Sequence, residues 1–208
     1  KDSRISCMNV IDAIQQRRAI KRFDPDFKIS DTDKKNLLSS VMENAPSAFN
    51  LQHWRPVLVE NVELRKQIRA IAWDQPQVTE SSLLIVLCAK VSTWEVDAKH
   101  VWDGAAPEVQ NIMVGAIDQY YRDRPQTQRD EVMRSAGIFA QTLMLLAQEH
   151  DLDSCPMDGF DFDAMAKLIN LPEDHVVCLM IAVGKSASQP YPRVGKLPYD
   201  NLITIDSF

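Results

Sequence analysis

The chain has 208 residues, a net charge of −6, 45% hydrophobic residues and 25% charged residues, a composition typical of one globular domain. This acidic balance argues against general affinity for nucleic-acid phosphates. The longest apolar runs, residues 83–89 and 176–183, fall far short of the roughly 20 residues that span a bilayer. Residues 1–10 lack the apolar core of a signal peptide. We therefore expect a single cytoplasmic domain over residues 1–208 that binds neither membranes nor nucleic acid.

The first half of the chain is predicted to contain three helices, a loop and a strand. Apolar residues near the 3.6-residue period mark the helices, and Ser30 with Asp33 has the spacing of a helix cap. The expected elements, in chain order, are a helix over residues 9–20, a helix from Ser30 until Pro46, a loop over 45–54, a strand over 56–60 and a helix from Asn61 to Ile71.

The second half is predicted to contain two central strands and a buried helix. The strands, residues 82–89 and 176–184, are apolar without alternation, as expected for strands buried on both faces. The helix, residues 131–150, is apolar on nearly all sides at its middle. The other expected elements are a polar stretch over 94–103, a helix over 107–121, a charged break over 122–130, a loop over 152–160, a short helix over 161–169 and a Pro-rich extended arm over 185–208 that ends in a strand over 201–205.

The order of these elements predicts an α+β fold in which helices pack on a small buried sheet. Strands and helices do not alternate regularly, which disfavours a doubly wound dinucleotide-binding fold. The sequence also contains neither G-x-G-x-x-G nor G-x-x-x-x-G-K-[ST], so no glycine-rich phosphate loop is expected.

The cysteines and histidines predict neither a disulfide framework nor a metal site. Cys7, Cys88, Cys155 and Cys178 include no C-x-x-C pair, and we expect all four thiols to be reduced. The four histidines show no ligand spacing. His150 precedes Cys155 by five positions, but nearness in sequence is weak support for a catalytic pair, and no G-x-S-x-G motif occurs.

Three segments combine residues that could bind a ligand. R-R-A-I-K-R-F at residues 17–23 places four cations within six residues, which repel one another unless they are solvated or hold an anion. P-S-A-F-N-L-Q-H-W at 46–54 is a loop of small polar residues beside aromatics, and C-P-M-D-G-F-D at 155–161 precedes a helix. Each has a simpler explanation: a solvated face, a loop anchored by Trp54, and a turn with Asp161 as a helix cap.

Together these segments resemble the FMN-dependent nitroreductase family in order and spacing over residues 11–205. The shared features are R-R-x-x-K/R-x-F, P-S-x-x-N-x-Q-x-W, P-x-[DE]-G-F-[DN] after a long apolar helix, and V-G-K with a basic residue before Leu-Pro. The resemblance implies a nitroreductase-like α+β fold with helices around a central mixed sheet. It also implies a homodimer with FMN at the interface, in which residues 185–208 of each subunit cross to the other.

The resemblance further implies how the first segment contacts FMN. Arg17, Arg18 and the backbone at Ala19 match the segment that holds the phosphate and ribityl chain, and guanidinium groups suit a dianionic phosphate. Lys21 matches the cation near flavin N1 and O2, where positive charge stabilises the reduced anion. The family usually has Ser at Ala19, and some relatives have Lys at Gln77, so this chain is expected to lack one hydroxyl and one cation.

The other implied contacts come from elsewhere in the chain. The backbone N–H groups of Asp158 and Gly159 would face flavin N5 and O4, so no side chain is expected to act as a general acid or base. The remaining cofactor contacts are Asp74 and Gln77 at the N1 edge, Pro156 and Met157 along the ring, Pro46, Ser47, Ala48 and Asn50 from the second subunit, and Arg193 and Lys196 from the tail.

The implied reaction is a ping-pong hydride transfer. NADH or NADPH reduces the flavin and leaves, and a nitroaromatic, a quinone or a related small molecule is then reduced in the same place. One alternative is a flavin or ene reductase, or another specialised member of the same fold. Such proteins differ in their substrate segment, here residues 94–130, and the sequence does not show which substrate this segment binds. A flavin-binding module without turnover and a scaffold without flavin are further alternatives.

Overall fold

A four-stranded sheet lies at the centre of the computed structural model, which describes residues 8–208. Its strand order is β1-β2-β4-β3, and every neighbouring pair is antiparallel. An isolated parallel bridge between Ala19 and Ser154 lies beside β3, but the four strands form an antiparallel sheet and not the mixed sheet that the resemblance implies. The strands are β1 (Trp54–Leu58), β2 (Leu83–Lys90), β3 (Asp153–Met157) and β4 (His175–Gly184).

Helices surround this sheet, and their starts follow the predicted caps. Ser30 Oγ accepts a hydrogen bond from the N–H of Asp33 at 3.1 Å, and Asn61 Oδ1 accepts one from the N–H of Leu64 at 2.9 Å. The helices are α1 (Val10–Gln16), α2 (Asp31–Asn44), α3 (Val62–Ile71), α4 (Gln77–Glu80), α5 (Thr93–Val96), α6 (Ala98–Val101), α7 (Pro107–Tyr121), α8 (Pro125–Glu149) and α9 (Phe162–Leu168), with 3₁₀ turns η1 (Ala48–Asn50) and η2 (Tyr199–Asn201).

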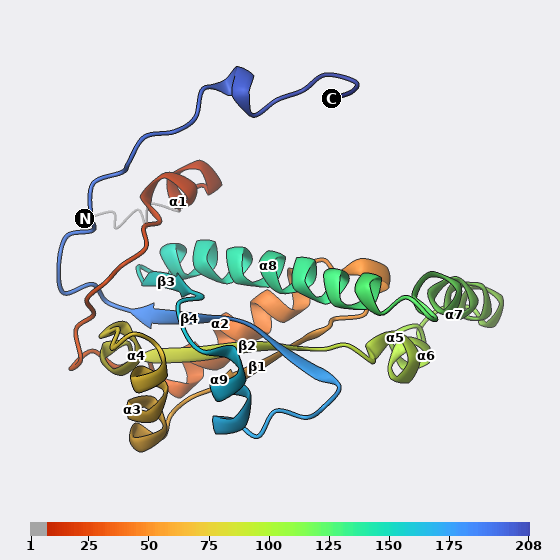
Figure 1. Cartoon of the computed structure of the whole chain (residues 1–208), viewed down its shortest axis with the longest axis horizontal. Helices are drawn as coiled ribbons and strands as arrows, with labels where there is room; N and C mark the ends of the chain where they lie inside the picture. The colour runs from red at the N-terminus through yellow and green to blue at the C-terminus, as the bar shows by residue number, and fades with distance from the viewer. Residues whose placement is uncertain (1–7) are drawn as a thin grey trace, which may run out of the picture.

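Two apolar cores lie on opposite faces of the sheet. Leu83, Ile85 and Leu87 of β2 belong to the core that α2 and α8 cover, whereas the intervening Leu84 and Val86 belong to the core that α3 and α9 cover. Figure 1 shows α8 above the sheet and α3 and α9 below it. Both faces are therefore buried, which explains why this strand reads as a continuous apolar run.

A third, smaller core lies at one end of the sheet. Trp94, Ile117 and Tyr121 pack there with Leu51, and Figure 1 places α5, α6 and α7 beyond the N-terminal end of α8. The stretch predicted as merely polar, residues 94–103, therefore holds two short helices that bury Trp94.

Four predicted boundaries are wrong, and each has a physical reason. The first helix ends at Gln16 because Arg17 leaves the helical backbone region (φ −55°, ψ 125°). The predicted break over 122–130 contains the start of α8, since Pro125 is compatible with the first helical turn. The predicted loop over 152–160 contains β3. This strand lies at the edge of the sheet, where polar residues and Pro156 are tolerated, so its sequence lacks the apolar pattern of a buried strand. The strand predicted over 201–205 does not form: a 3₁₀ turn ends at Asn201, and residues 202–205 pair with no strand.

The segment that follows α1 extends the sheet edge by a few contacts. The N–H of Ile20 donates to the carbonyl of Ser154 at 3.1 Å. The N–H of Asp24 donates to the carbonyl of Lys185 at 2.8 Å, and the N–H of Ala187 to the carbonyl of Arg22 at 2.9 Å. Residues 19–24 are thereby fixed along β3 and the start of the tail.

The tail leaves the body of the molecule, as Figure 1 shows. The whole chain exposes 12,933 Å², well above the roughly 9,800 Å² expected for a compact monomer of this mass. The exposed apolar side chains of the tail include Tyr191, Val194, Leu197, Tyr199, Leu202, Ile203, Ile205 and Phe208.

Two further predictions concern thiols and membranes. Cys88, Cys155 and Cys178 are free and buried, as expected, and Cys7 lies outside the described residues. Within residues 8–208, no helix combines the length and the apolar character needed to cross a bilayer.

Candidate functional site

Two of the three predicted binding segments, together with Gln77, converge on β3. The Ala19–Ser154 bridge brings Lys21 to Cys155, with Nζ 3.7 Å from Sγ. Gln77 of α4 approaches the same thiol, with Nε2 3.9 Å from Sγ. Segments far apart in the sequence therefore meet at one edge of the sheet. We call this group the β3 site, and it comprises Arg17, Arg18, Ala19, Lys21, Gln77 and residues 155–159.

The tail adds a further cation to the β3 site. Arg193 Nη2 donates to the carbonyl of Gln15 at 2.6 Å and to that of Arg17 at 3.3 Å. Arg18 Nη2 donates to the carbonyl of Tyr191. These contacts are to neutral carbonyls, whereas Arg22 pairs with the carboxylate of Glu80 at 2.8 Å. The cations at the end of α1 thus keep a net positive charge that suits an anion.

Buried polar atoms without partners also lie at the β3 site. Gln77 is 1% exposed, and its Oε1 has no hydrogen-bond partner among the described residues. The hydroxyl of Ser154 is fully buried and also has no hydrogen-bond partner among the described residues. An unsatisfied buried acceptor costs about 1–3 kcal/mol, so a ligand that donates a hydrogen bond to Gln77 would stabilise this site.

A turn that sequence reasoning missed holds the far side of the site. Gln75 Nε2 donates to the carbonyl of Gly159 at 3.0 Å. A Cβ at Gly159 would lie 2.7 Å from the ring of Trp73, so a larger residue there would have to displace this exposed ring. Trp73 and Asp74 both have φ of 52°, a conformation unfavourable for such residues. The only sequence signal for this turn was the Gln-Pro step that follows it.

Two predicted residues lie apart from these contacts. The carboxylate of Asp74 pairs with Arg69 of α3, with Oδ1 2.6 Å from Nε, and is largely exposed. Lys196 lies on the exposed part of the tail. The weakly supported pair of His150 and Cys155 does not form, because His150 is exposed while Cys155 is fully buried between Lys21 and Gln77.

The second predicted segment lies at the opposite end of the sheet. The carbonyl of Phe49 accepts a hydrogen bond from Trp102 Nε1 at 3.1 Å, and the Phe49 ring packs 5.7 Å from that of Tyr120. Ser47 Oγ accepts from the N–H of Gln52 at 2.9 Å. We call residues 46–50 the aromatic-end loop, which contains Pro46, Ser47, Ala48 and Asn50.

The strand register fixes how far apart the two groups lie. Trp54, just after the aromatic-end loop, pairs with Ala89 at the end of β2. Cys155 of the β3 site aligns with Ala182, which pairs with Leu84 near the start of β2. At about 3.3 Å per residue along β2 and about 4.8 Å between neighbouring strands, Cys155 and Trp54 are roughly 20 Å apart. One copy of the chain therefore does not bring the two predicted segments together.

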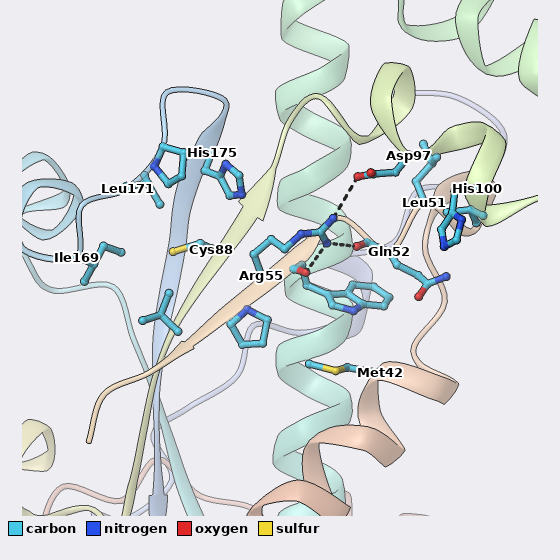
Figure 2. A pocket seen from close by; sticks show the side chains of 15 residues that line it. Met42, Leu51, Gln52, Arg55, Cys88, Asp97, His100, Ile169, Leu171 and His175 are labelled. Carbon is cyan, nitrogen blue, oxygen red and sulfur yellow. Dashed lines mark hydrogen bonds and ion pairs between the residues drawn. The ribbon is translucent and has the colours of Figure 1, made fainter. Parts of the chain in front are cut away.

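A cavity against β1 was not predicted and contains none of the predicted site residues. It measures about 830 Å³ and is lined by β1 together with Met42, Leu171 and His175. Figure 2 shows the Arg55 guanidinium in this cavity, bonded to the carbonyls of Gln52 and Trp54 at 2.8 Å and to Asp97 at 3.2 Å. Its cation is thus already paired, in contrast to those of the β3 site.

A buried histidine stands behind the aromatic-end loop. His53 is 1% exposed, and its Nδ1 bonds Thr93 Oγ1. Burial lowers its pKa to about 4, against the opposing influence of Glu131. Its Nε2 and the hydroxyl of Tyr121 have no partners among residues 8–208. His53 is therefore a neutral core residue near pH 7.

A family model described as the nitroreductase family matches residues 14–185. The chain belongs to the nitroreductase family. Protein DrgA of Synechocystis sp. is 43% identical over 178 residues, which cover 86% of this chain and 84% of DrgA. YodC of Bacillus subtilis, named as a candidate NAD(P)H nitroreductase, is 28% identical over 201 residues, which cover 94% of this chain and 98% of YodC.

A solved structure shares the whole nitroreductase fold with this chain. It is a candidate nitroreductase from Exiguobacterium sibiricum in complex with FMN, with a TM-score of 0.86 and 26% identity, and the match covers 95% of this chain and 97% of that one. The predicted nitroreductase-like α+β fold is therefore confirmed. Of the predicted site residues, Arg193 and Lys196 lie beyond the range that the family model matches.

Proposed function

We propose that this nitroreductase-family protein is an FMN-dependent oxidoreductase that uses NADH or NADPH to reduce nitroaromatics, quinones or related small molecules. The observation that carries the proposal is the convergence of Lys21, Gln77 and the Gly159 turn beside a cluster of arginines. The complex of a structural relative with FMN and the name of YodC support the choice of cofactor and electron donor.

The chemistry of the β3 site fits FMN. Among residues 8–208 the guanidinium groups of Arg18 and Arg193 donate only to neutral carbonyls, so together with Arg17 they would supply positive charge for the phosphate. The buried Oε1 of Gln77 lacks a donor, which the imide N–H of a flavin would supply. The absence of a Cβ at Gly159 lets a backbone turn pack closely, as a flat ring requires.

Each part of the site has a distinct role in this proposal. Lys21 stabilises negative charge at the N1 edge of the ring, and Gln77 holds the same edge. The N–H groups of Asp158 and Gly159 would donate to the flavin, and Pro156 and Met157 would lie beside its ring. Bound FMN supplies the hydride chemistry, while the protein supplies position and charge. No side chain is required as a general acid or base.

We further propose that the functional unit is a homodimer of a single domain that spans residues 1–208. The aromatic-end loop lies about 20 Å from the β3 site of its own chain, so it would complete the site of a second copy. Residues 185–208 expose many apolar side chains, which suits an arm that crosses to that copy.

The visible absorption spectrum of the purified protein tests this proposal. We expect an oxidised-flavin spectrum that bleaches anaerobically with NADH or NADPH and returns on addition of a quinone or a nitroaromatic. Flavin that binds but is reduced by neither nucleotide would indicate a binding module without turnover. A colourless protein that takes up no added FMN would overturn the proposal.

A further inference from the structure

The turn that presents the N–H group of Gly159 is held by a side chain outside the predicted cofactor contacts. We propose that Gln75 is a positioning residue that orients this N–H toward the flavin. The inference rests on the proposed function, because it assigns a role within the same site. It concerns how the site is built, rather than which groups touch FMN.

The first step is the hydrogen bond from Gln75 Nε2 to the carbonyl of Gly159, at 3.0 Å. The peptide group is planar, so the carbonyl of Gly159 and the N–H of Phe160 lie in one rigid plane. Gln75 therefore fixes the orientation of this first plane.

The second step passes through the backbone itself. The N–H of Phe160 donates to the carbonyl of Asp158 at 3.0 Å, a three-residue turn. That carbonyl shares its peptide plane with the N–H of Gly159. Two consecutive planes are thus tied in series, and neither of these bonds uses the Gly159 N–H, which stays available as a donor.

The far end of the turn is anchored independently. The N–H of Asp161 donates to the carbonyl of Ile71 at 3.0 Å, and Asp161 Oδ1 caps α9 by accepting from the N–H of Ala164 at 2.9 Å. The Gly159 carbonyl lies between this anchor and β3. Gln75 supplies its side-chain donor, and the rotation of the Gly159 plane depends on that bond.

Gln75 also connects the turn to the cationic side of the site. Its Oε1 accepts from Gln77 Nε2 at 3.4 Å, and Gln77 Nε2 lies 3.9 Å from Cys155 Sγ. Lys21 Nζ lies 3.7 Å from the same sulfur. A continuous chain of polar contacts therefore runs from Lys21 to Gly159 and spans the two edges at which the flavin would be held.

Backbone strain places Gln75 where it can make these contacts. Trp73 and Asp74 both adopt φ of 52°, and Arg69 holds the turn through Asp74 and through Thr79 Oγ1 at 2.9 Å. The Trp73 ring fills the space where a Cβ on Gly159 would lie. Strain of this kind persists where the surrounding contacts determine the geometry, and it clusters at functional sites.

The test compares Gln75→Met and Gln75→Glu with a matched control, Gln128→Met. Both Gln75 variants remove the hydrogen-bond donor, but only Gln75→Glu adds a charge. If both variants change the readouts equally, the change is caused by the lost hydrogen bond and not by the charge. Gln128 Nε2 also donates to a backbone carbonyl, that of Tyr121, at 2.9 Å in a partly buried position. The control therefore loses a similar bond away from the β3 site.

Two readouts separate the local structure from flavin binding. Deuterium exchange at the amides of residues 158–161 in the apoprotein should be about fivefold faster in both Gln75 variants, as expected for one lost hydrogen bond. With ¹⁵N-labelled FMN, the N5 resonance of both variants should move toward its value in a solvent that donates no hydrogen bonds. The Gln128→Met protein should match the wild type in both measurements.

Each outcome decides the inference separately from the proposed function. Unchanged exchange in the apoprotein overturns the positioning role of Gln75, whatever FMN does. Faster exchange with an unchanged N5 resonance overturns the link between the turn and the flavin but leaves FMN binding intact. Failure of the wild-type protein to bind FMN overturns the proposed function, and this inference with it.

Discussion

The two ends of the sheet hold their predicted ligand-binding residues in different ways. At the β3 site, backbone and polar contacts dominate: residues 19–24 pair along a strand edge, and Gln75 and Gln77 bond across to the turn at Gly159. At the aromatic-end loop, ring packing dominates, with Phe49 against Tyr120 and Tyr121. The first end carries cations that no carboxylate pairs with among residues 8–208, whereas the residues of the aromatic-end loop are uncharged.

This difference is what our proposal of two half-sites in a homodimer requires. The β3 site offers cations and polar groups but lies at the edge of the fold, while the aromatic-end loop offers an apolar wall without charge. The buried strand β2 keeps them about 20 Å apart and is not a hinge, because both of its faces lie in packed cores. A second copy of the chain is the simplest way to join them.

Deleting residues 186–208 should have the largest effect on this arrangement. We expect both half-sites to fold, but dimer association to weaken by more than about 1,000-fold because the exposed apolar side chains of the arm lose their partner surface. Sedimentation velocity of the truncated and full-length proteins measures this. A truncated chain that still forms a tight dimer would show that the arm is not the main contact.

Replacing both Arg17 and Arg18 with Ala should weaken FMN binding by about 100-fold or more, since each charge-assisted bond to a phosphate contributes about 1.5–3 kcal/mol. Fluorescence titration of the apoprotein measures the change in Kd. Lys66→Ala is the control, because this exposed cation pairs with Glu63 on α3. Equal Kd values for the wild type and the double variant would remove the arginines from the site.

The aromatic end should be the acid-sensitive one. The pKa of His53 is lowered from 6.5 to about 4 in the folded state, so the unfolded state binds the proton first. The free energy of unfolding should therefore fall by up to about 1.4 kcal/mol per pH unit as the pH drops from 6.5 toward 4. Urea unfolding at several pH values measures the slope, and His53→Asn should remove this contribution. An unchanged slope in that variant would assign the acid sensitivity elsewhere.

The close approach at the β3 site gives the smallest predicted effect. Gly159→Ala should lower the free energy of unfolding by about 1–3 kcal/mol, as overpacking does, because the new Cβ meets the Trp73 ring at 2.7 Å. Adding Trp73→Ala should recover part of this loss. Gly137→Ala in α8 is the control, since nothing lies within 4 Å of its Cβ position and alanine favours the helix. If adding Trp73→Ala recovers nothing, the clash is not the cause.

The features that the sequence predicted are those with local causes. Ser30 and Asn61 cap their helices through neighbouring residues, and the apolar runs of β2 and β4 reflect burial on both faces. The order of the binding segments identified the family from the same chain-local patterns. Such signals depend on a few consecutive residues, so they can be recognised in the sequence without knowledge of the fold.

The features that the sequence missed depend on distant contacts. The strand β3 is short, contains Pro156 and becomes a strand only by pairing with β4. Gln75 acts through Gly159, which is 84 residues away in the chain. None of these contacts has a period or a cap that a local pattern could show.

The central claim is that each flavin site combines the β3 site of one copy with the aromatic-end loop of another. Mixed dimers test it most directly, with Arg17→Ala and Arg18→Ala in one copy and Ala48→Glu in the other. Each variant alone should bind FMN weakly. In the mixed dimer both defects fall in one site, so we predict one FMN per dimer bound with wild-type affinity. Mixed dimers that bind FMN no better than either parent would contradict the claim, because a site built within a single copy would be defective in both.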